Sequence, residues 1–509
     1  MKHFSQTTFP LKNLDALIAS AIGFYIIYLY TNHSGIGISP DSIVYLSTAR
    51  NIHLHHSIID LSGKALADFP VFYPIFLSFL IYITKLDPLV CAPLLNGILF
   101  ALVIYISGWI MEAFIVRSKW YKYIILSCMA ISPCLLQVYS MLWSETLFIL
   151  FTLLFFISFK YYLQSYSLKR LFLVACIAGL SCITRYAGIT LIGTAGLILL
   201  FDNKLLLHKK IGHLLLFGLT GSLLLVLNYI RNIMLSGTLM GNRETSLTSF
   251  TDAIHNFGAV LCYWLPLPKE NYSIAFCVGC FVILCFIALF IYRLLKRSDY
   301  TSYENITTVF FIVYAFFMLL SATFSRYEIF SSRLLSPIFI SFLWGSSCLL
   351  PIFKKQFFLN KKLLIVFIAG LLTLSFQANQ WMIDSDSYEG IKDAGMPGFA
   401  EDSWNKESEI VQFLKSHPTI FQPDKVVYSN ANEAVYFYTN LQCEDLPHIV
   451  ISQQLRQFAS CNKFYLVWFN DINNPELIDL KTVLSEKKIY PLYKFSNGTI
   501  YSTDAASNK

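Results

Sequence analysis

The stretch Gly37–Asn51, GISPDSIVYLSTARN, follows the first long apolar run of the chain, Leu14–Tyr30. Its beginning is typical of a helix start. Ser39 suits the N-cap, Pro40 suits the first helical position, and Asp41 falls in the first turn, at the positive end of the helix dipole. The stretch therefore predicts a short polar helix directly after the first membrane span.

Two interpretations of Asp41 remain open from its position alone. Ile43, Val44 and Leu46 give the predicted helix an apolar stripe suited to lying along a membrane surface. A carboxylate on such a helix is held at the boundary between water and lipid, where it can act as a general base. A carboxylate in a first turn also stabilises a helix without any catalytic role.

Composition places the chain in a membrane. Of its 509 residues, 56% are hydrophobic and only 14% are charged, which excludes an ordinary soluble globular protein. Apolar runs close to the roughly 20 residues needed to cross a bilayer recur along most of the chain. The net charge of +7 comes from short basic clusters between these runs. It therefore indicates membrane topology and not nucleic-acid binding.

The basic clusters alternate with connections that are not basic, as the positive-inside rule requires. This alternation predicts a multi-pass protein of the cell membrane with a cytoplasmic N-terminus. The loop 32–70 and the C-terminal region are then extracytoplasmic. The first apolar run lacks a small-residue cleavage site, which favours a retained signal anchor. The clusters are Arg117/Lys119/Lys122, Lys160/Lys169/Arg170, Lys204/Lys209/Lys210, Arg293/Lys296/Arg297 and Lys354/Lys355/Lys361/Lys362.

The apolar runs predict a polytopic α-helical membrane protein with about 11–13 transmembrane helices, of which about eleven are full crossings. The run 71–84 is short and contains Pro74, so we expect it to be re-entrant or interfacial. After Leu14–Tyr30 and 88–110, the predicted spans are 122–139, 146–160, 171–184, 187–201, 213–230, 273–292, 306–324, 334–350 and 363–379.

A change in composition near Trp381 predicts a second domain. Acidic residues become more frequent and the long apolar runs stop. We therefore expect a transmembrane domain over 1–380, which includes the loop 32–70, and a soluble extracytoplasmic α/β domain over 381–509. Its expected elements are strands at Lys425–Ser429 and Phe464–Phe469, helices near 404–415 and 475–486, and a hairpin at Tyr490–Tyr501 around Asn497-Gly498.

Most of the twelve cysteines lie within or beside apolar runs, where they act as small hydrophobic residues and show no metal-ligand spacing. Cys443 and Cys461 instead lie in the predicted outer domain, where a disulfide can form. The sequence leaves a disulfide and two unpaired thiols equally open.

Charged residues gather at the span ends that the basic clusters place outside the cytoplasm. Glu145 follows Trp143-Ser144 at the start of a predicted span, and Arg185 lies in the tight turn of SCITRYAG. One arginine at a span end usually only reaches toward lipid headgroups, but several beside two carboxylates favour a functional site. The other charged residues of this set are Arg231, Arg243, Arg326, Glu328 and Arg333.

These residue types suit one kind of reaction. Arginines at the membrane boundary can hold a lipid-linked phosphate through charge-assisted, bidentate hydrogen bonds. A carboxylate can take a proton from an incoming hydroxyl or amine. Guanidinium groups also stabilise a phosphate as its bond to a sugar breaks. The residues therefore predict glycosyl transfer from a polyprenyl-phosphate sugar on the extracytoplasmic face.

At these residues the sequence resembles the C-type, membrane-integral glycosyltransferases (the GT-C fold). The resemblance is to the family 39-like branch of the protein O-mannosyltransferases and lipid A aminoarabinose transferases. It covers about the first 340 residues and rests on the order of several motifs. These are Asp41, FPVFYPIFLSFL (Phe69–Leu80), LLNGILFALV (Leu94–Val103), SPCLLQVYSMLWSETLF (Ser132–Phe148), LSCITRYAGITL (Leu180–Leu191) and the run Arg231–Arg243.

The resemblance implies that Asp41 is the base, that Glu145 stands where many members have aspartate, and that Arg185 faces the lipid phosphate. FPVFYP replaces the His-Pro-Pro stretch common in these relatives, which leaves the acceptor and any metal requirement open. A divalent cation held by Asp41 and Glu145 is one expectation. The other residues expected to contact substrate are Tyr45, Arg231, Arg243, Arg326 and Arg333.

Two alternative functions remain open. A transporter or flippase of lipid-linked sugars would place ionisable groups or broken helices near the membrane midplane, commonly in two related halves, and the sequence shows neither. A polysaccharide polymerase or ligase would use the same lipid donor and the same arginines. The expected partners are a polyprenyl-phosphate sugar, membrane lipids and an unidentified acceptor, with no nucleic acid.

Overall fold

The computed structural model describes residues 13–241, 243, 245–297, 299–325, 329–350 and 359–504, without the side chains of residues 349 and 359–369. The chain divides into two compact units. The bundle unit consists of Met1–Tyr30, Ala67–Tyr73 and Cys91–Gly390, and the sheet unit of Thr31–Leu66, Pro74–Val90 and Ile391–Lys509. The sheet unit thus joins most of the first loop to the C-terminal region, and the domain boundary near residue 380 stays a prediction.

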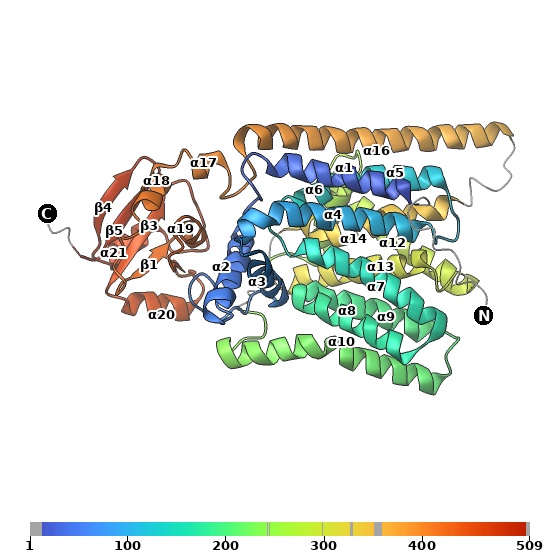
Figure 1. The fold of residues 1–509 in the computed structure, drawn as a ribbon, viewed down its shortest axis with the longest axis horizontal. Helices are drawn as coiled ribbons and strands as arrows, with labels where there is room; N and C mark the ends of the chain where they lie inside the picture. The colour runs from blue at the N-terminus through green and yellow to red at the C-terminus, as the bar shows by residue number, and fades with distance from the viewer. Residues whose placement is uncertain are drawn as a thin grey trace. The chain divides into compact units, whose positions relative to one another are not determined.

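The bundle unit is built of helices that run largely side by side (Figure 1). Among the described residues, six helices are long and apolar enough to cross a membrane: α1 (Leu14–Thr31), α4 (Pro88–Met111), α7 (Glu145–Ser165), α10 (Leu207–Ser236), α12 (Tyr272–Lys296) and α13 (Tyr303–Phe324). They confirm a polytopic α-helical membrane protein, whereas the count of about eleven crossings stays a prediction. The remaining elements are α5 (Lys119–Ala130), α6 (Pro133–Tyr139), α8 (Leu168–Thr184), η1 (Tyr186–Gly188), α9 (Ile189–Phe201), α11 (Phe250–Trp264), α14 (Ser332–Gly345), η2 (Ser346–Leu349) and α16 (Leu359–Ala394).

The span predicted over 122–139 is divided into α5 and α6, which are bent by 49° relative to each other. Ser132 caps α6, because its hydroxyl accepts a hydrogen bond from the amide of Leu135 at 3.4 Å, and Pro133 takes the first helical position. Proline disfavours helical backbone at the residue before it, so α5 cannot continue through Ser132. The predicted span is therefore a bent helix pair, either a broken span or a re-entrant loop, and hydropathy alone did not reveal the bend.

Helix α11 lies between the predicted spans 213–230 and 273–292, where the sequence predicted no helix. Polar residues such as Asp252, His255 and Asn256 interrupt its apolar pattern, which is why it was missed. Helices α11 and α12 approach closely at glycines. A methyl group on Gly258 would lie 1.8 Å from the carbonyl oxygen of Ala275. Small residues at such contacts let two helix backbones pack directly against each other.

We expect Gly258→Ala to destabilise the bundle unit by about 1–3 kcal/mol, because the added methyl group forces α11 and α12 apart. Gly212→Ala in α10 is the matched control, since no atom lies within 4 Å of the position that its methyl group would take and alanine favours helix. Thermal unfolding of the purified protein in detergent measures both variants. An unfolding midpoint of Gly258→Ala equal to that of Gly212→Ala would contradict the close approach.

The sheet unit contains a five-stranded sheet in the order β2-β1-β3-β5-β4 (Figure 1). The central β3 is almost entirely buried, and β4 and β5 form the predicted hairpin around Asn497-Gly498. The predicted small α/β fold is confirmed. The strands are β1 (Val426–Ser429), β2 (Glu444–Asp445), β3 (Phe464–Phe469), β4 (Tyr490–Phe495) and β5 (Gly498–Ser502), and the helices are α2 (Pro40–His55), α3 (Phe72–Thr84), α17 (Asp402–Asn405), α18 (Glu409–Ser416), α19 (Asn432–Thr439), α20 (Ser452–Ser460) and α21 (Leu480–Glu486).

Helix α2 begins as its sequence predicts. Ser39 is the N-cap, its amide donates to the hydroxyl of Ser42 at 3.1 Å, and Pro40 takes the first helical position. The expected lipid-facing stripe is wrong, however. Ile43 and Leu46 are fully buried inside the protein, and α2 packs against α19 of the C-terminal region. The apolar face of α2 that we expected at the membrane surface therefore packs inside the protein instead.

Two further features agree with what the sequence allowed. Helix α3 has 13 residues, which rise about 20 Å, less than the roughly 30 Å of a hydrocarbon core. Its length supports a re-entrant or interfacial element. Cys443 and Cys461 are free thiols, so of the two alternatives the structure has the unpaired one.

Candidate active site

Glu145, the first residue of α7, is a fully buried carboxylate that joins two distant arginines. Its Oε1 lies 2.7 Å from Nε of Arg333, and its Oε2 lies 2.6 Å from Nη1 of Arg185. Arg333 stands in the first turn of α14, and Arg185 is the single residue between α8 and η1. The structure thus brings together three predicted site residues, which we call the arginine–glutamate cluster.

The two residues before Glu145 hold the arginines in place. The hydroxyl of Ser144 accepts a hydrogen bond from Nη1 of Arg185 at 3.0 Å. The guanidinium carbon of Arg333 lies 4.1 Å from the ring centre of Trp143, in a cation–π contact. Each arginine therefore has a second partner besides the shared carboxylate of Glu145: Ser144 for Arg185 and Trp143 for Arg333.

The arginine–glutamate cluster brings two guanidinium groups to one buried carboxylate. The side chains of Arg185 and Arg333 are only 17% and 10% exposed, so water screens their charges poorly. Two guanidinium groups in such surroundings can hold an anion such as a phosphate through charge-assisted hydrogen bonds.

A second network begins at Tyr186, the residue after Arg185. Its hydroxyl donates to the carbonyl oxygen of Ala67 at 3.1 Å and accepts from Nδ2 of Asn232 at 3.4 Å. Nη1 of Arg231 in turn donates to Oδ1 of Asn232 at 3.0 Å. Arg231 is thereby connected through Asn232 to Tyr186, the residue that follows Arg185 in the chain.

The remaining predicted arginines have different outcomes. Arg243 is exposed, and its Nη2 donates to the carbonyl oxygen of Asp68 at 3.0 Å, on the same short segment as Ala67. Arg326 lies outside the described residues. Four of the five predicted arginines are therefore described, and all four belong to the bundle unit.

Asp41 and Tyr45 lie on α2 of the sheet unit. Tyr45 is only 2% exposed, which is typical of a core residue. Glu433, at the start of α19, is a carboxylate neighbour of Asp41 that the sequence analysis missed. Burial, and in addition the negative charge of Asp41, raise the pKa of the Glu433 carboxyl above its ordinary value. The carboxylate of Asp41 on α2 therefore favours the protonated form of Glu433 on α19.

The donor atoms around Glu145 decide whether it can bind a metal ion. Both oxygens of Glu145 already face a guanidinium nitrogen, so a divalent cation at this carboxylate would meet two fixed positive charges. Within the described part of the chain, no three His, Cys, Asp or Glu side chains are grouped so that they could hold a metal ion. Glu145 therefore does not fit the role of a metal ligand.

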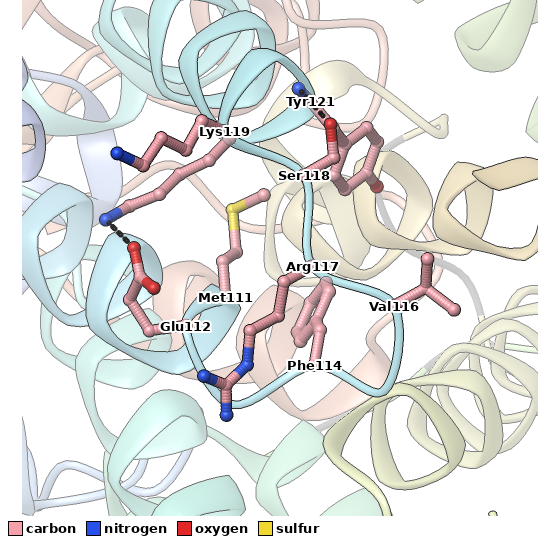
Figure 2. A pocket seen from close by; sticks show the side chains of 9 residues that line it. Met111, Glu112, Phe114, Val116, Arg117, Ser118, Lys119 and Tyr121 are labelled. Carbon is pink, nitrogen blue, oxygen red and sulfur yellow. Dashed lines mark hydrogen bonds and ion pairs between the residues drawn. The ribbon is translucent and has the colours of Figure 1, made fainter. Parts of the chain in front are cut away.

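A small cavity in the bundle unit lies beside the loop between α4 and α5 (Figure 2). Its volume is about 30 Å³, and Arg117 and Lys119 are among its lining residues. Lys122 is almost fully buried there, with Nζ 2.6 Å from Oε1 of Glu112 and 2.9 Å from Oδ1 of Asp15. A cavity of this size holds little more than one water molecule. We therefore interpret the contacts of Lys122 as structural ion pairs, and the cavity beside them is too small for a substrate.

The residues that sequence reasoning missed differ in how visible they were. Ser144 and Trp143 directly precede Glu145, and Tyr186 and Asn232 directly follow predicted arginines. Adjacency to a candidate residue was therefore a usable signal for these four. Glu433 had no such signal, because its proximity to Asp41 depends on how α19 packs against α2.

By sequence, the chain matches no family model and no curated protein. Three solved structures are similar in fold. ArnT from Cupriavidus metallidurans in the apo state gives a TM-score of 0.58 at 11% identity over 97% of each chain. ArnT bound to undecaprenyl phosphate gives 0.56 at 11% identity, over 97% of this chain and 98% of that one. AglB, the oligosaccharyltransferase of Archaeoglobus fulgidus, in complex with an inhibitory peptide and a dolichol-phosphate, gives 0.55 at 12% identity, over 97% and 74%. The chain therefore has the fold of the membrane-integral, C-type glycosyltransferases, GT-C, which its motifs resemble.

Proposed function

We propose that the protein is an integral-membrane glycosyltransferase that moves a sugar from a polyprenyl-phosphate donor to an acceptor. The observation that carries the proposal is the arginine–glutamate cluster, in which the guanidinium groups of Arg185 and Arg333 meet at one buried carboxylate, because arginine side chains suit a phosphate group. The fold adds support, because the similar ArnT structure contains undecaprenyl phosphate and the similar AglB structure contains a dolichol-phosphate.

In the proposed reaction, a nucleophilic oxygen or nitrogen of the acceptor forms a bond to the anomeric carbon of the donor sugar. The bond between that carbon and the phosphate oxygen breaks, and the electron pair leaves with the polyprenyl phosphate. Asp41 takes the proton from the acceptor as general base. Arg185 and Arg333 stabilise the negative charge that develops on the departing phosphate, and Glu145 holds both guanidinium groups in position.

The direct test is a transfer assay with the purified protein in lipid nanodiscs and a radiolabelled polyprenyl-phosphate sugar. We expect label to move to an acceptor in a membrane extract and the polyprenyl phosphate to be released in equal amount. Release of label to water alone would indicate hydrolysis and contradict a transferase.

Transport of a lipid-linked sugar is the second candidate, because broken helices such as the bent pair α5–α6 also occur in transporters. The same labelled donor, enclosed in sealed liposomes with the protein, separates the two functions. Movement of an intact donor across the bilayer, without bond cleavage, would favour a flippase.

Arg185→Ala is expected to weaken donor binding by about 1.5–3 kcal/mol, because it removes a charge-assisted hydrogen-bond donor from the phosphate. Lysine at this position should restore only part of the affinity, since it lacks the planar fork of donors. Equilibrium binding of the labelled donor in nanodiscs measures the effect.

Arg170→Ala is the matched control for Arg185→Ala. Arg170 lies in the first turn of the same helix, α8, and its Nη1 donates to the carbonyl oxygen of Tyr161 on the molecular surface. We expect unchanged donor affinity in this variant. Normal affinity in Arg185→Ala as well would remove the proposed phosphate contact.

The alternating basic clusters support an orientation of the protein in the membrane. We propose a cytoplasmic N-terminus and an extracytoplasmic C-terminal region. Reporter fusions after Phe201 should therefore report the cytoplasm, and fusions after Lys269 or Asn405 should report the outside. A cytoplasmic signal at Asn405 would overturn the proposed side of the reaction.

A further inference from the structure

A cavity of about 550 Å³ lies within the sheet unit, in the size range of small-ligand sites. The proposed transfer mechanism does not use it. Its wall combines the end of α2, the end of α3 and residues of α19 and the loop that follows. The polar side chains that matter most are Arg50, His53, Lys85, Asp87, Tyr436 and Asn440.

Three helix C-termini meet at this cavity. Helices α2, α3 and α19 are each followed by a residue in the left-handed conformation, namely His56, Lys85 and Asn440, with φ angles of +53°, +59° and +59°. Each of these residues donates its backbone amide to the last turn of its helix. A helix C-terminus also presents carbonyl oxygens that have no partner within the helix. The cavity is therefore bordered by hydrogen-bond acceptors of the main chain.

Arg50, the penultimate residue of the stretch Gly37–Asn51, is fixed in the cavity wall. Its Nε donates to Oδ2 of Asp87 at 2.8 Å, and its Nη1 donates to Oδ1 of Asn440 at 2.7 Å. The phenol of Tyr436 lies near enough to the Arg50 guanidinium to feel its charge. The two hydrogen bonds hold one guanidinium against partners from the end of α3 and from the C-terminal region. A fixed wall of this kind loses little side-chain freedom when a ligand binds.

The charges around the cavity nearly cancel. Arg50 and Lys85 contribute two positive charges, and Asp87 contributes one negative charge. Each of the three helix C-termini adds about half a negative charge. With neutral histidines, the cavity favours neither an anion nor a cation strongly. This balance differs from the arginine–glutamate cluster, where two guanidinium groups meet at one carboxylate.

A ligand that suits this wall must both donate and accept hydrogen bonds without carrying charge. Main-chain carbonyls and Asp87 accept, whereas Arg50, Lys85 and side-chain amides donate. A hydroxyl group does both at once. Ile81, Leu86 and the ring of Tyr436 also line the cavity and offer apolar contact to the C–H face of a sugar ring.

We propose that this cavity binds an uncharged saccharide and serves as the subsite for the sugar part of the acceptor. The assignment to the acceptor rests on the proposed transferase function. The assignment of an uncharged saccharide rests on the cavity itself, namely its charge balance, its mixed donors and acceptors, and its fixed guanidinium.

The test is equilibrium binding of uncharged saccharides to the full-length protein in nanodiscs, by saturation-transfer NMR. The probes are the trimers of glucose, mannose and N-acetylglucosamine, with inorganic phosphate as the anionic probe. We expect at least one trimer to bind and phosphate not to compete with it. Arg50→Lys and Lys85→Asn should each raise its Kd by about tenfold, which corresponds to one lost hydrogen bond to a charged group.

The variants are chosen so that folding can be separated from binding. Asparagine is well tolerated at positive φ, so Lys85→Asn removes the ammonium and keeps the end of α3. Lys64→Gln is the control, because Lys64 is an exposed lysine of the same unit, paired with Glu444 at 2.9 Å. We expect it to leave the Kd unchanged. Thermal unfolding of all three variants shows whether the sheet unit remains folded.

Two results would overturn the inference. If phosphate binds and the same variants weaken it, the cavity is an anion site. If no probe binds the wild-type protein, the basic side chains serve only the helix ends. Neither result depends on the transfer assay. Transfer without saccharide binding would reject this inference alone, and saccharide binding without transfer would reject the proposed function alone.

Discussion

Asp41→Asn should lower sugar transfer by about two to four orders of magnitude, because asparagine cannot take the proton of the acceptor. Asparagine keeps the size of aspartate. Asp41 follows the Ser39 N-cap and Pro40 in the first turn of α2, so the substitution also removes an interaction with the helix dipole. That interaction is worth about 0.3–1 kcal/mol, too little to unfold the sheet unit. The expected variant is therefore folded and inactive.

The measurement is the initial rate of transfer from a polyprenyl-phosphate sugar, recorded beside the thermal unfolding midpoint of the same preparation. Asp252→Asn is the matched control, because Asp252 is a first-turn aspartate of α11 that accepts a hydrogen bond from the hydroxyl of its N-cap, Ser249. This control should lose a little stability and keep its activity. A fully active Asp41→Asn would leave Asp41 as a helix-stabilising residue and remove it from catalysis.

Glu145→Gln should have the largest effect on stability. Removing one member of a buried ion pair leaves the other charge without compensation and costs about 3–5 kcal/mol. Here two guanidinium groups, those of Arg185 and Arg333, would lose their shared carboxylate. We expect a markedly lower unfolding midpoint and loss of transfer, because the arginines no longer hold their positions.

Glu112→Gln is the control for Glu145→Gln. Glu112 is 42% exposed, and its partner Lys122 also contacts Asp15, so its loss should cost only about 0–1 kcal/mol. A combined variant, Glu145→Leu with Arg185→Met and Arg333→Met, removes all three charges together. It should regain much of the stability, as apolar replacements of buried ionic groups commonly do, and remain inactive. An unfolding midpoint of Glu145→Gln equal to that of the wild type would contradict a buried, shared carboxylate.

Much of the fold could be predicted because local chemistry determines it. Ser39, Pro40 and Asp41 satisfy the start of a helix through their own side chains and backbone preferences. Asn497-Gly498 closes a hairpin in the same local way, and the apolar run Phe464–Phe469 is a buried strand. The order of the membrane motifs indicated the fold class, which the similar solved structures confirm.

Other features required the tertiary structure. Helix α11 was missed because polar residues interrupt its apolar pattern, and its close contact with α12 at Gly258 cannot be read from the sequence. The apolar face of α2 was assigned to lipid because a sequence cannot distinguish a membrane surface from a protein partner. Hydropathy also joined α5 and α6, although Pro133 separates them.

The candidate site also has features that the sequence predicts and features that only the tertiary structure shows. The sequence by itself determined which residues are chemically able to act, because charged side chains at the ends of apolar spans are costly and therefore conspicuous. Only the tertiary structure decided that Glu145 pairs with both Arg185 and Arg333, which are 40 and 188 residues away from it in the chain, and that Glu433 neighbours Asp41. Ion pairing falls off over a few ångströms, and separation in sequence places no limit on separation in space. The packing of the helices determines which charged side chains become neighbours, and a local sequence pattern contains no information on that packing.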